Sequence, residues 1–332
     1  MNLARFPRRR YTKGRTPLER LTRFSQAIGG PNIYIKRDDL LGLTGGGNKT
    51  RKLEFLVADA LAQGADTLIT CGGVQSNHCR LTLAAAVKEG LKCRLVLSEI
   101  VPGSYNPEAN GNIFLYHLLN VEKVKVVPWG TDLMAELQSA AAQAVNEGCK
   151  PYIIPMGGSN HLGTLGYIAC VEEIMAQTFE TGVNIDHVVL PGGSAGTHSG
   201  LLLGLYGNNC RIPVTGISVL NPKAVLENRI SELVQQTAAY MKIKVKIPRE
   251  EIVCVDQYIG PGYTLPTIEM VEAVKLLAST EGILLDPTYT GKAMAGLIGL
   301  AKQGCFKKDD NVLFLHTGGL PGLYANTSLF MS

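Results

Sequence analysis

The sequence predicts an α/β protein built on parallel sheets, and three observations carry this prediction. Short apolar runs typical of buried strands alternate with segments of helical periodicity along nearly the whole chain. Helices between successive strands are the connections that parallel sheets require. The chain has 332 residues, of which 45% are hydrophobic and 18% are charged, enough for a large core and for two domains.

Strands and helices are expected in regular succession. The first clear helix is indicated by apolar residues at helical spacing from Leu53 to Leu61, and it is expected to end at Gly64. Strands are expected over residues 67–70, 94–97, 124–127, 152–154, 187–190, 214–219 and 312–315. Helices are expected over 76–88, 133–146 and 165–176, and from His198 onward. Because no linker or repeat interrupts this order, any two domains must be closely joined.

Composition excludes several classes of protein. The formal charge is only +4 and the single basic run is Arg8–Arg9–Arg10, so we expect no nucleic-acid partner. No apolar stretch approaches the roughly 20 residues that span a bilayer, and no apolar segment follows Arg10 as a secretory signal would require. The eight cysteines form no C-x-x-C pair, which favours reduced thiols. We therefore expect a cytoplasmic protein without a metal site or a membrane partner.

Five glycine-rich or polar turns are the candidates for function. Four of them follow predicted strands, and the fifth precedes the first clear helix. In open parallel sheets, ligands bind beyond the carboxyl ends of the strands, so we expect these turns to converge on one cleft. The turns are residues 43–52, 71–77, 157–160, 192–197 and 316–319.

Nucleotide-binding motifs do not fit these turns. A P-loop requires lysine directly after its second glycine, but Asn48 stands between Gly47 and Lys49. The turn after Leu190 lacks the G-x-G-x-x-G spacing of a dinucleotide site. Backbone N–H groups over residues 193–197 can still surround a phosphate. The sequence therefore predicts a simple phosphate cup.

Lys49 follows three consecutive glycines and begins a helix. With Arg51 and Lys52 it opposes the helix dipole, so we expect an anion nearby. The same field is expected to lower the pKa of the Lys49 amine and to favour its neutral, nucleophilic form. A phosphorylated aldehyde cofactor linked to lysine needs this arrangement.

Six motifs, in order along nearly the whole chain, resemble the pyridoxal-phosphate enzymes of the aminocyclopropane-carboxylate deaminase and D-cysteine desulfhydrase family. They are residues 35–39, 46–54, 75–78, 193–197, 286–292 and 316–319. The resemblance implies the tryptophan-synthase-β-like fold (pyridoxal-phosphate fold type II), with two parallel-sheet α/β domains and the cofactor, pyridoxal 5'-phosphate, in the cleft between them. It implies a large cofactor-binding domain over residues 1–50 and 164–332, a small inserted α/β domain over 51–163, and a homodimer.

The resemblance also implies the role of each site residue. Lys49 is similar to the Schiff-base lysine of the family. The phosphate cup corresponds to Gly193, Ser194, Ala195, Gly196 and Thr197, with Lys52 and Asn77 as auxiliary contacts. The catalytic set is completed by Ser76, which meets the substrate near its carboxylate, and by the two tyrosines Tyr263 and Tyr289. The substrate-binding set is Ser76, Asn77, His78, Tyr263 and Tyr289.

Departures from the deaminase pattern bear on the substrate. Thr290 and Thr317 stand where the deaminases carry a glutamate and an apolar residue, and they are expected near the pyridine nitrogen of the cofactor. With His78, they are similar to D-cysteine desulfhydrases, which implies β-elimination of sulfide to give pyruvate and ammonia. Residues 6–11 and 29–31 look equally like L-cysteate sulfo-lyases, which eliminate sulfite. Ring opening of aminocyclopropane carboxylate is the third alternative, and a non-catalytic amino-acid-binding protein is the rival from another class.

Overall fold

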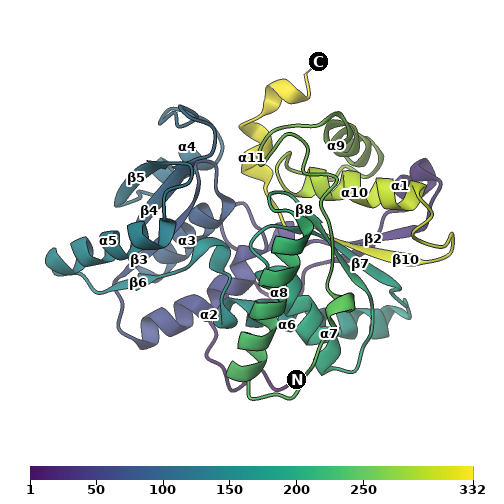
Figure 1. Ribbon diagram of the computed structural model, residues 1–332, viewed down its shortest axis with the longest axis horizontal. Helices are drawn as coiled ribbons and strands as arrows, with labels where there is room; N and C mark the ends of the chain where they lie inside the picture. The colour runs from purple at the N-terminus through teal and green to yellow at the C-terminus, as the bar shows by residue number, and fades with distance from the viewer. Residues whose placement is uncertain (332) are drawn as a thin grey trace.

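The strands of the chain form two sheets, as the sequence predicts. The structure is a computed structural model that describes residues 1–331. The larger sheet has the order β1-β2-β10-β7-β8-β9 and the smaller one the order β5-β4-β3-β6. All neighbouring strands are parallel except β1 and β2. Figure 1 shows the smaller sheet on the left and the larger one on the right.

The strands have the following bounds. The larger sheet consists of β1 (Leu18–Arg20), β2 (Asn32–Lys36), β7 (His187–Gly192), β8 (Val214–Ser218), β9 (Val253–Val255) and β10 (Asn311–Leu315). The smaller sheet consists of β3 (Thr67–Gly73), β4 (Lys92–Glu99), β5 (Lys123–Pro128) and β6 (Pro151–Ile153).

Helices cover both faces of the larger sheet. In β7, Val188 and Leu190 point into one core cluster and Val189 into another, because alternate residues of a strand face opposite sides. The first cluster is closed by α6 (His161–Thr181), α7 (Gly196–Gly207) and α8 (Lys223–Tyr240). The second is closed by α1 (Thr22–Ile28), α9 (Ile268–Glu281) and α10 (Thr290–Lys302).

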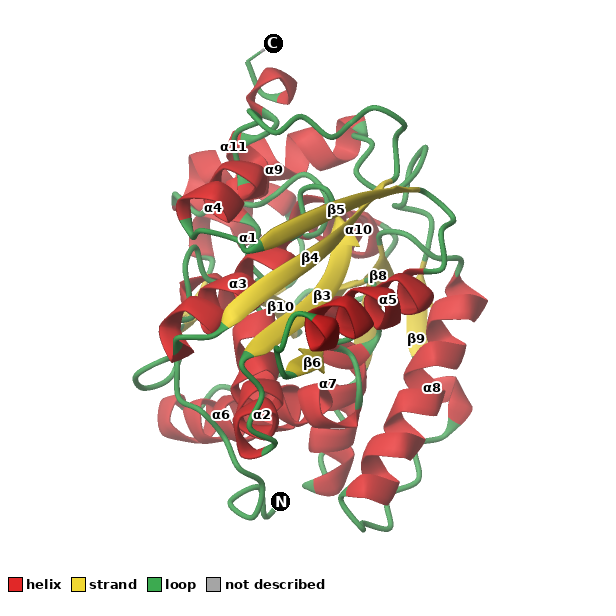
Figure 2. Cartoon of the chain, turned by 90° about the vertical axis from the view of Figure 1, so that its left-hand side faces the viewer, coloured by secondary structure: helices red, strands yellow, loops and turns green. Residues whose placement is uncertain are grey.

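The smaller sheet is covered in the same way. In β3, Leu68 packs with α2 (Lys49–Ala62), α3 (Asn77–Glu89) and α4 (Asn112–Leu118). Its neighbour Ile69 packs on the opposite face with α5 (Leu133–Asn146), which lies in front of the strands in Figure 2. The remaining helix is the short α11 (Leu320–Tyr324). The strands of this sheet all fall within residues 51–163, and the domain boundaries themselves stay a prediction.

Helix α2 connects the two halves of the molecule. It packs on α6 at Gly166, where an added Cβ would lie 2.4 Å from the carbonyl oxygen of Arg51. This close approach requires glycine and puts successive residues of α2 against different parts of the protein. The positions of Lys49, Arg51 and Lys52 are therefore set by one rigid element.

Some element boundaries differ from the prediction for physical reasons. β3 continues through Gly72 and Gly73 because these residues pair with β4. α6 begins at His161, four residues earlier than expected, because the Asn160 side chain accepts a hydrogen bond from the N–H of Gly163 at 2.9 Å and caps the helix. No helix of the described residues is long and apolar enough to cross a membrane.

Candidate functional site

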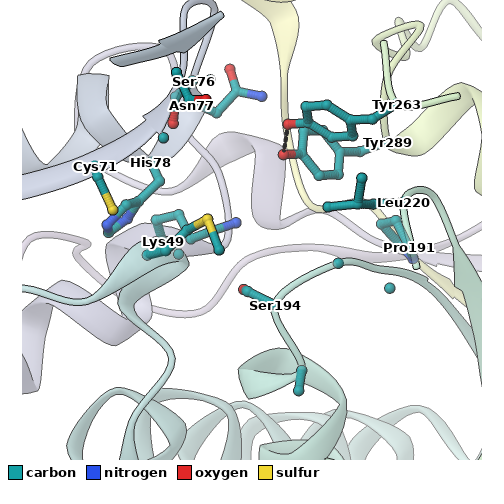
Figure 3. Close-up of a pocket in the computed structure, with 18 of the residues that line it drawn as sticks. Lys49, Cys71, Ser76, Asn77, His78, Pro191, Ser194, Leu220, Tyr263 and Tyr289 are labelled. Carbon is teal, nitrogen blue, oxygen red and sulfur yellow. Dashed lines mark hydrogen bonds between the residues drawn. The ribbon is translucent and has the colours of Figure 1, made fainter. Parts of the chain in front are cut away.

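The five predicted turns line one cavity of about 250 Å³. The end of β3 contributes Cys71, Gly72 and Gly73, and the end of β7 contributes residues 192–195. The cavity therefore lies at the carboxyl ends of strands from both sheets, where a doubly wound fold binds its ligands. Figure 3 shows Lys49 in the middle, with Ser76 and His78 on one side and the two tyrosines on the other.

Glycine geometry holds Lys49 at the start of α2. Gly45, Gly46 and Gly47 all have positive φ, at 71°, 61° and 124°. A Cβ on Gly46 would lie 1.7 Å from the carbonyl oxygen of Asp39, so no other residue fits there. The three glycines are required by the close packing of the loop, and they deliver the lysine to the cavity.

The Lys49 amine belongs to a short chain of hydrogen bonds. Its Nζ donates to Oδ1 of Asn48 at 2.9 Å, and Nδ2 of Asn48 donates to Oγ1 of Thr197 at 2.9 Å. This chain links the lysine directly to the predicted phosphate cup. The Nζ atom also lies 5.9 Å from the centroid of the Tyr289 ring.

The pKa of Lys49 is lowered to about 8, mainly by burial and next by the nearby Arg80 guanidinium, while Asp286 opposes the change. The sequence predicts a lowered pKa for Lys49 but attributes it to the helix dipole with Arg51 and Lys52, whereas burial and Arg80 cause it in the structure. Arg51 points away and forms ion pairs with Asp38 and Glu173. The role of Arg80 could not be predicted from the sequence, because nothing distinguishes it from other polar residues of a helix.

Arg80 is a fixed cation behind the lysine. It is fully buried, and its Nη2 donates to the carbonyl oxygen of Gly46 at 2.7 Å. Its Nη1 donates to Oδ1 of Asn77 at 3.0 Å and to Oδ1 of Asn112 at 2.9 Å. The guanidinium therefore ties the glycine loop to the start of α3 and keeps a positive charge beside Lys49.

The turn from Gly193 to Thr197 has the shape of an anion site. Ala195 has a φ of 69°, uncommon for a residue with a side chain. A Cβ on Gly196 would lie 2.6 Å from Oγ of Ser159 and 2.9 Å from Nζ of Lys52. In the described chain, the backbone N–H groups of Ala195 and Thr197 have no backbone acceptor, and α7 begins at Gly196. Free N–H groups at a helix start are the ligands that a phosphate needs.

Lys52 places an amine beside the cup. Its Nζ donates to the carbonyl oxygen of Gly157 at 3.0 Å and to Oγ of Ser159 at 3.1 Å. Burial holds the pKa of this amine well below its usual value, and no ion pair within residues 1–331 includes it. A buried amine without a carboxylate, next to free N–H groups, fits the phosphate of pyridoxal 5'-phosphate.

Ser76 and Asn77 present donors at the start of α3. Oγ of Ser76 accepts from the N–H of Cys79 at 3.2 Å, which leaves its own proton free to donate. Oδ1 of Asn77 is occupied by Arg80 and Asn112, so the Asn77 amide N–H₂ is the part left for a ligand. Both residues line the cavity. The arrangement suits a carboxylate at a helix N-terminus.

The proton on His78 follows from its neighbours. Oγ1 of Thr70 donates to the carbonyl oxygen of Ile154 at 2.7 Å, so it accepts from Nε2 of His78 at 2.8 Å. Nδ1 of His78 is then the unprotonated nitrogen. Burial, with Lys49 and Lys52 adding to it, holds the pKa of His78 well below its usual value. The ring is therefore neutral at physiological pH.

Tyr263 and Tyr289 form a pair opposite Ser76. Their hydroxyl groups are hydrogen-bonded to each other (Figure 3), and their rings meet edge to face with centroids 5.7 Å apart. Burial raises the pKa of Tyr289 to about 12 and that of Tyr263 well above its usual value. Both hydroxyls therefore keep their protons and can donate them.

The two threonines have different surroundings. Thr317 lines the cavity, and its hydroxyl has no protein partner in the described part of the chain. Thr290 does not line the cavity, because its hydroxyl donates to Oδ1 of Asp286 at 2.7 Å and accepts from the N–H of the same residue. The structure thus brings Thr317 to the cavity but not Thr290.

Many residues of the cavity wall were not predicted from the sequence. They are Ser98, Ile100, Trp129, Gly130, Thr131, Leu133, Met156, Leu220, Leu226 and Arg229. Most of these are single apolar residues after strands, and no motif distinguishes them. Arg229 is exposed and lies in the cavity wall without an ion pair or hydrogen bond within residues 1–331.

Comparison with known proteins agrees with this site. The family model described as pyridoxal-phosphate dependent enzyme matches residues 10–318. A solved structure of an ACC deaminase homologue is 38% identical, with a TM-score of 0.88, over 98% of this chain and 96% of that one. O-ureido-L-serine synthase is 18% identical, with a TM-score of 0.68, over 97% and 95% of the two chains, and shows the fold alone. The protein has pyridoxal-phosphate fold type II, and it belongs to the family of pyridoxal-phosphate dependent enzymes.

Proposed function

We propose that this enzyme is a carbon–sulfur lyase that converts D-cysteine into pyruvate, ammonia and hydrogen sulfide. One observation carries the proposal: a lysine of lowered pKa and a pair of protonated tyrosines face each other across a single cavity. A base on one side of a three-carbon amino acid and an acid on the other are what β-elimination requires.

The residues present fit the cofactor. The Gly193–Thr197 turn and Lys52 would hold its phosphate, Lys49 would carry its aldehyde carbon, and Thr317 would contact its ring nitrogen. When bound, pyridoxal phosphate withdraws electrons from the α carbon of the attached amino acid. Thr317 offers a neutral hydroxyl, which cannot keep that nitrogen fully protonated. A weaker electron sink suits elimination of a good leaving group.

The α3 start binds and orients the substrate. The Ser76 hydroxyl and the Asn77 amide donate to its carboxylate, and the helix N-terminus adds its partial positive charge. With the carboxylate held there, Lys49 would serve Cα and the tyrosines would serve the sulfur, because these residues line the same cavity. Neutral His78 adds no charge to this wall, so it does not compete for the carboxylate.

The elimination itself moves two protons. Lys49 takes the proton from Cα, and Ser76 is the second candidate for that step. The Cα–H electron pair becomes the Cα–Cβ double bond as the Cβ–S bond breaks, and a tyrosine hydroxyl gives its proton to the departing sulfur. The aminoacrylate released then hydrolyses to pyruvate and ammonia.

L-cysteate is the second candidate substrate, and Arg229 is the observation that favours it. A sulfonate leaving group carries a negative charge, and a free guanidinium in the cavity wall could attract it. A thiolate leaving group needs only a proton, which a tyrosine hydroxyl could supply without Arg229. The 1-aminocyclopropane-1-carboxylate reaction ranks third, because Thr290 replaces the glutamate of the deaminases and points to Asp286.

Pyruvate release from four amino acids tests the proposal. D-cysteine, L-cysteine, L-cysteate and 1-aminocyclopropane-1-carboxylate are supplied side by side to the holoenzyme. D-cysteine is expected to react fastest, with one sulfide per pyruvate. Sulfite from L-cysteate as the main activity would move the assignment to the second candidate. Binding of these amino acids without release of pyruvate from any of them would favour the non-catalytic rival.

We also propose that the protein is a cytoplasmic homodimer, as the family resemblance suggests. Sedimentation of the purified holoenzyme at micromolar concentration tests the dimer. A single species of about 36 kDa, the mass of one chain, would contradict it.

A further inference from the structure

Asp286 is a buried carboxylate to which the proposed reaction gives no role. Its side chain is 1% exposed, and it lies just before α10. None of the ion pairs in the described part of the chain includes it. A buried charge is costly unless its surroundings compensate it. Its local contacts must therefore account for its presence.

Four hydrogen bonds hold the carboxylate. Oδ2 accepts from the N–H groups of Thr288 and Tyr289, each at 3.0 Å. Oδ1 accepts from the N–H of Thr290 at 2.8 Å and from its hydroxyl at 2.7 Å. A Cβ on Gly319 would lie 2.6 Å from Cβ of Asp286, so a tightly packed backbone closes the other side. Because three donors are consecutive backbone groups, the carboxylate fixes the conformation of the whole turn.

The turn fixes the position of Tyr289. The Tyr289 backbone donates to Asp286, and its ring faces Lys49 Nζ at 5.9 Å. The other tyrosine is secured by Lys292, whose Nζ donates to the carbonyl oxygen of Ile259 at 2.6 Å and to that of Gly262 at 2.8 Å. Two charged side chains that bind the backbone thus hold the hydrogen-bonded tyrosines of Figure 3: Asp286 holds Tyr289, and Lys292 holds the segment that carries Tyr263.

Burial raises the pKa of Asp286, and the hydrogen bonds from Thr288, Tyr289 and Thr290 oppose this change and favour the charged carboxylate. That charge also acts on the surrounding groups. Burial lowers the pKa of Lys49, Arg80 and Lys292, and Asp286 opposes this lowering for each of them. The other titratable groups that it affects are Tyr263, Tyr289 and His316. Lys49 in turn lowers the pKa of Lys52, on the same helix, and of His78 on α3.

We propose that Asp286 is a positioning residue: it fixes Tyr289 against Lys49 through the backbone and supplies the negative charge that balances Lys49 and Arg80. A simple helix cap would do neither, because its effect would be confined to the stability of α10. The effect on kcat rests on the proposed function, whereas the effect on the titration midpoint of Lys49 does not.

The charge is tested on cofactor-free protein. D286N has nearly the same shape and no charge, and D309N removes an exposed carboxylate as the matched control. The rate of Lys49 carbamylation by cyanate, read by peptide mass spectrometry against pH, gives the titration midpoint of the amine. D286N is expected to lower this midpoint by about one pH unit, and D309N to leave it unchanged. A wild-type midpoint in folded D286N would overturn the electrostatic role.

The positioning role is tested in the holoenzyme. D286N is expected to lower kcat about 100-fold with KM changed less than about threefold. If Asp286 acts through Tyr289, then D286N combined with Y289F is little slower than Y289F alone. Independent, multiplying effects of the two substitutions would overturn the positioning role.

T290V covers the case in which D286N does not fold. It removes one of the four hydrogen bonds and keeps the charge, so the Lys49 midpoint should stay at the wild-type value. We expect kcat to fall about tenfold in T290V, and Y289F to mask that fall. Unchanged kcat, or a fall that Y289F does not mask, would overturn the proposal. If the wild type releases no pyruvate from any tested amino acid, the proposed function fails, while the cyanate titration still decides the role of Asp286.

Discussion

Two clusters of buried cations lie on opposite sides of α2, and they differ in how their charge is compensated. On one side Arg51 forms ion pairs with Asp38 and Glu173, and Lys36 pairs with Glu173 as well. On the other side Lys49, Lys52 and Arg80 line or flank the cavity, and none of them forms an ion pair within residues 1–331. Arg51 and Lys52 are adjacent in sequence.

The pKa values show what this difference means. Ion pairs raise the pKa of Arg51 well above its usual value and lower that of Asp38, so both stay charged. Burial without an ion-pair partner lowers the pKa of Lys49 to about 8 and holds that of Lys52 well below its usual value. The ion-paired (compensated) cluster serves structure, and the cluster without ion pairs (uncompensated) is available to a ligand. Each of the following predictions tests one side of this comparison.

The largest effect is expected from K49A. Loss of the proton carrier should lower kcat for pyruvate release at least a thousandfold. The stability of the cofactor-free protein should change little, because Lys49 forms no ion pair that the substitution would break. Pyruvate assays and thermal unfolding measure the two quantities. K49A protein that still formed a borohydride-reducible adduct at a lysine with the cofactor would contradict the assignment.

D38N tests the compensated cluster. Asp38 accepts from Arg51 twice and from the hydroxyls of Thr16 and Tyr167. Breaking a buried ion pair on one side costs about 3–5 kcal/mol, so urea unfolding should show a loss of this size. R15A, which removes an exposed ion pair with Glu180, is the control and should change stability by less than about 1 kcal/mol. Equal losses of unfolding free energy in D38N and R15A would contradict the structural role of the ion-paired cluster.

K52M tests the phosphate role of the uncompensated cluster. The variant keeps the length of the side chain and removes its charge. We expect cofactor affinity to fall about 10- to 100-fold, measured by absorbance titration. Inorganic phosphate should stabilise the cofactor-free wild type against heat and should not stabilise K52M. Equal stabilisation of both proteins would remove Lys52 from the phosphate site.

A smaller effect is expected from pH. A folded-state pKa of about 8 for Lys49, below its usual 10.5, means that the unfolded chain binds more protons between these values. Stability of the cofactor-free protein should therefore rise as pH increases from 8 toward 10.5, and K49M should show a smaller rise. At the acid end, the lowered pKa of Asp38 contributes stability above pH 4 that is lost as pH falls below it. Denaturant unfolding at several pH values measures both trends.

Local pattern was enough to predict the strands and the turns between them. β3, β4, β5, β6, β7, β8 and β10 were all expected, because each is an apolar run bounded by turn residues. The edge strands β1 and β9 were missed. β1 contains a single apolar residue, Leu18, so no apolar run marks it, whereas β9 lies in the apolar run 252–255 and was still not predicted. Helix α8 was also missed, although its buried residues Leu226, Ile230 and Leu233 recur at helical spacing.

The sequence by itself was enough to predict which turns line the cavity, and it predicts that Lys49 faces a phosphate compound. Those inferences depend on glycines, hydroxyls and a lysine within a few residues of one another. Only the tertiary structure decided how each charge is compensated. Glu173, which pairs with Arg51, is 122 residues away, and Arg80 reaches Gly46 across 34 residues. Compensation of a buried charge depends on neighbours in space, so Arg51 became structural while Lys52, the next residue, was left for a ligand.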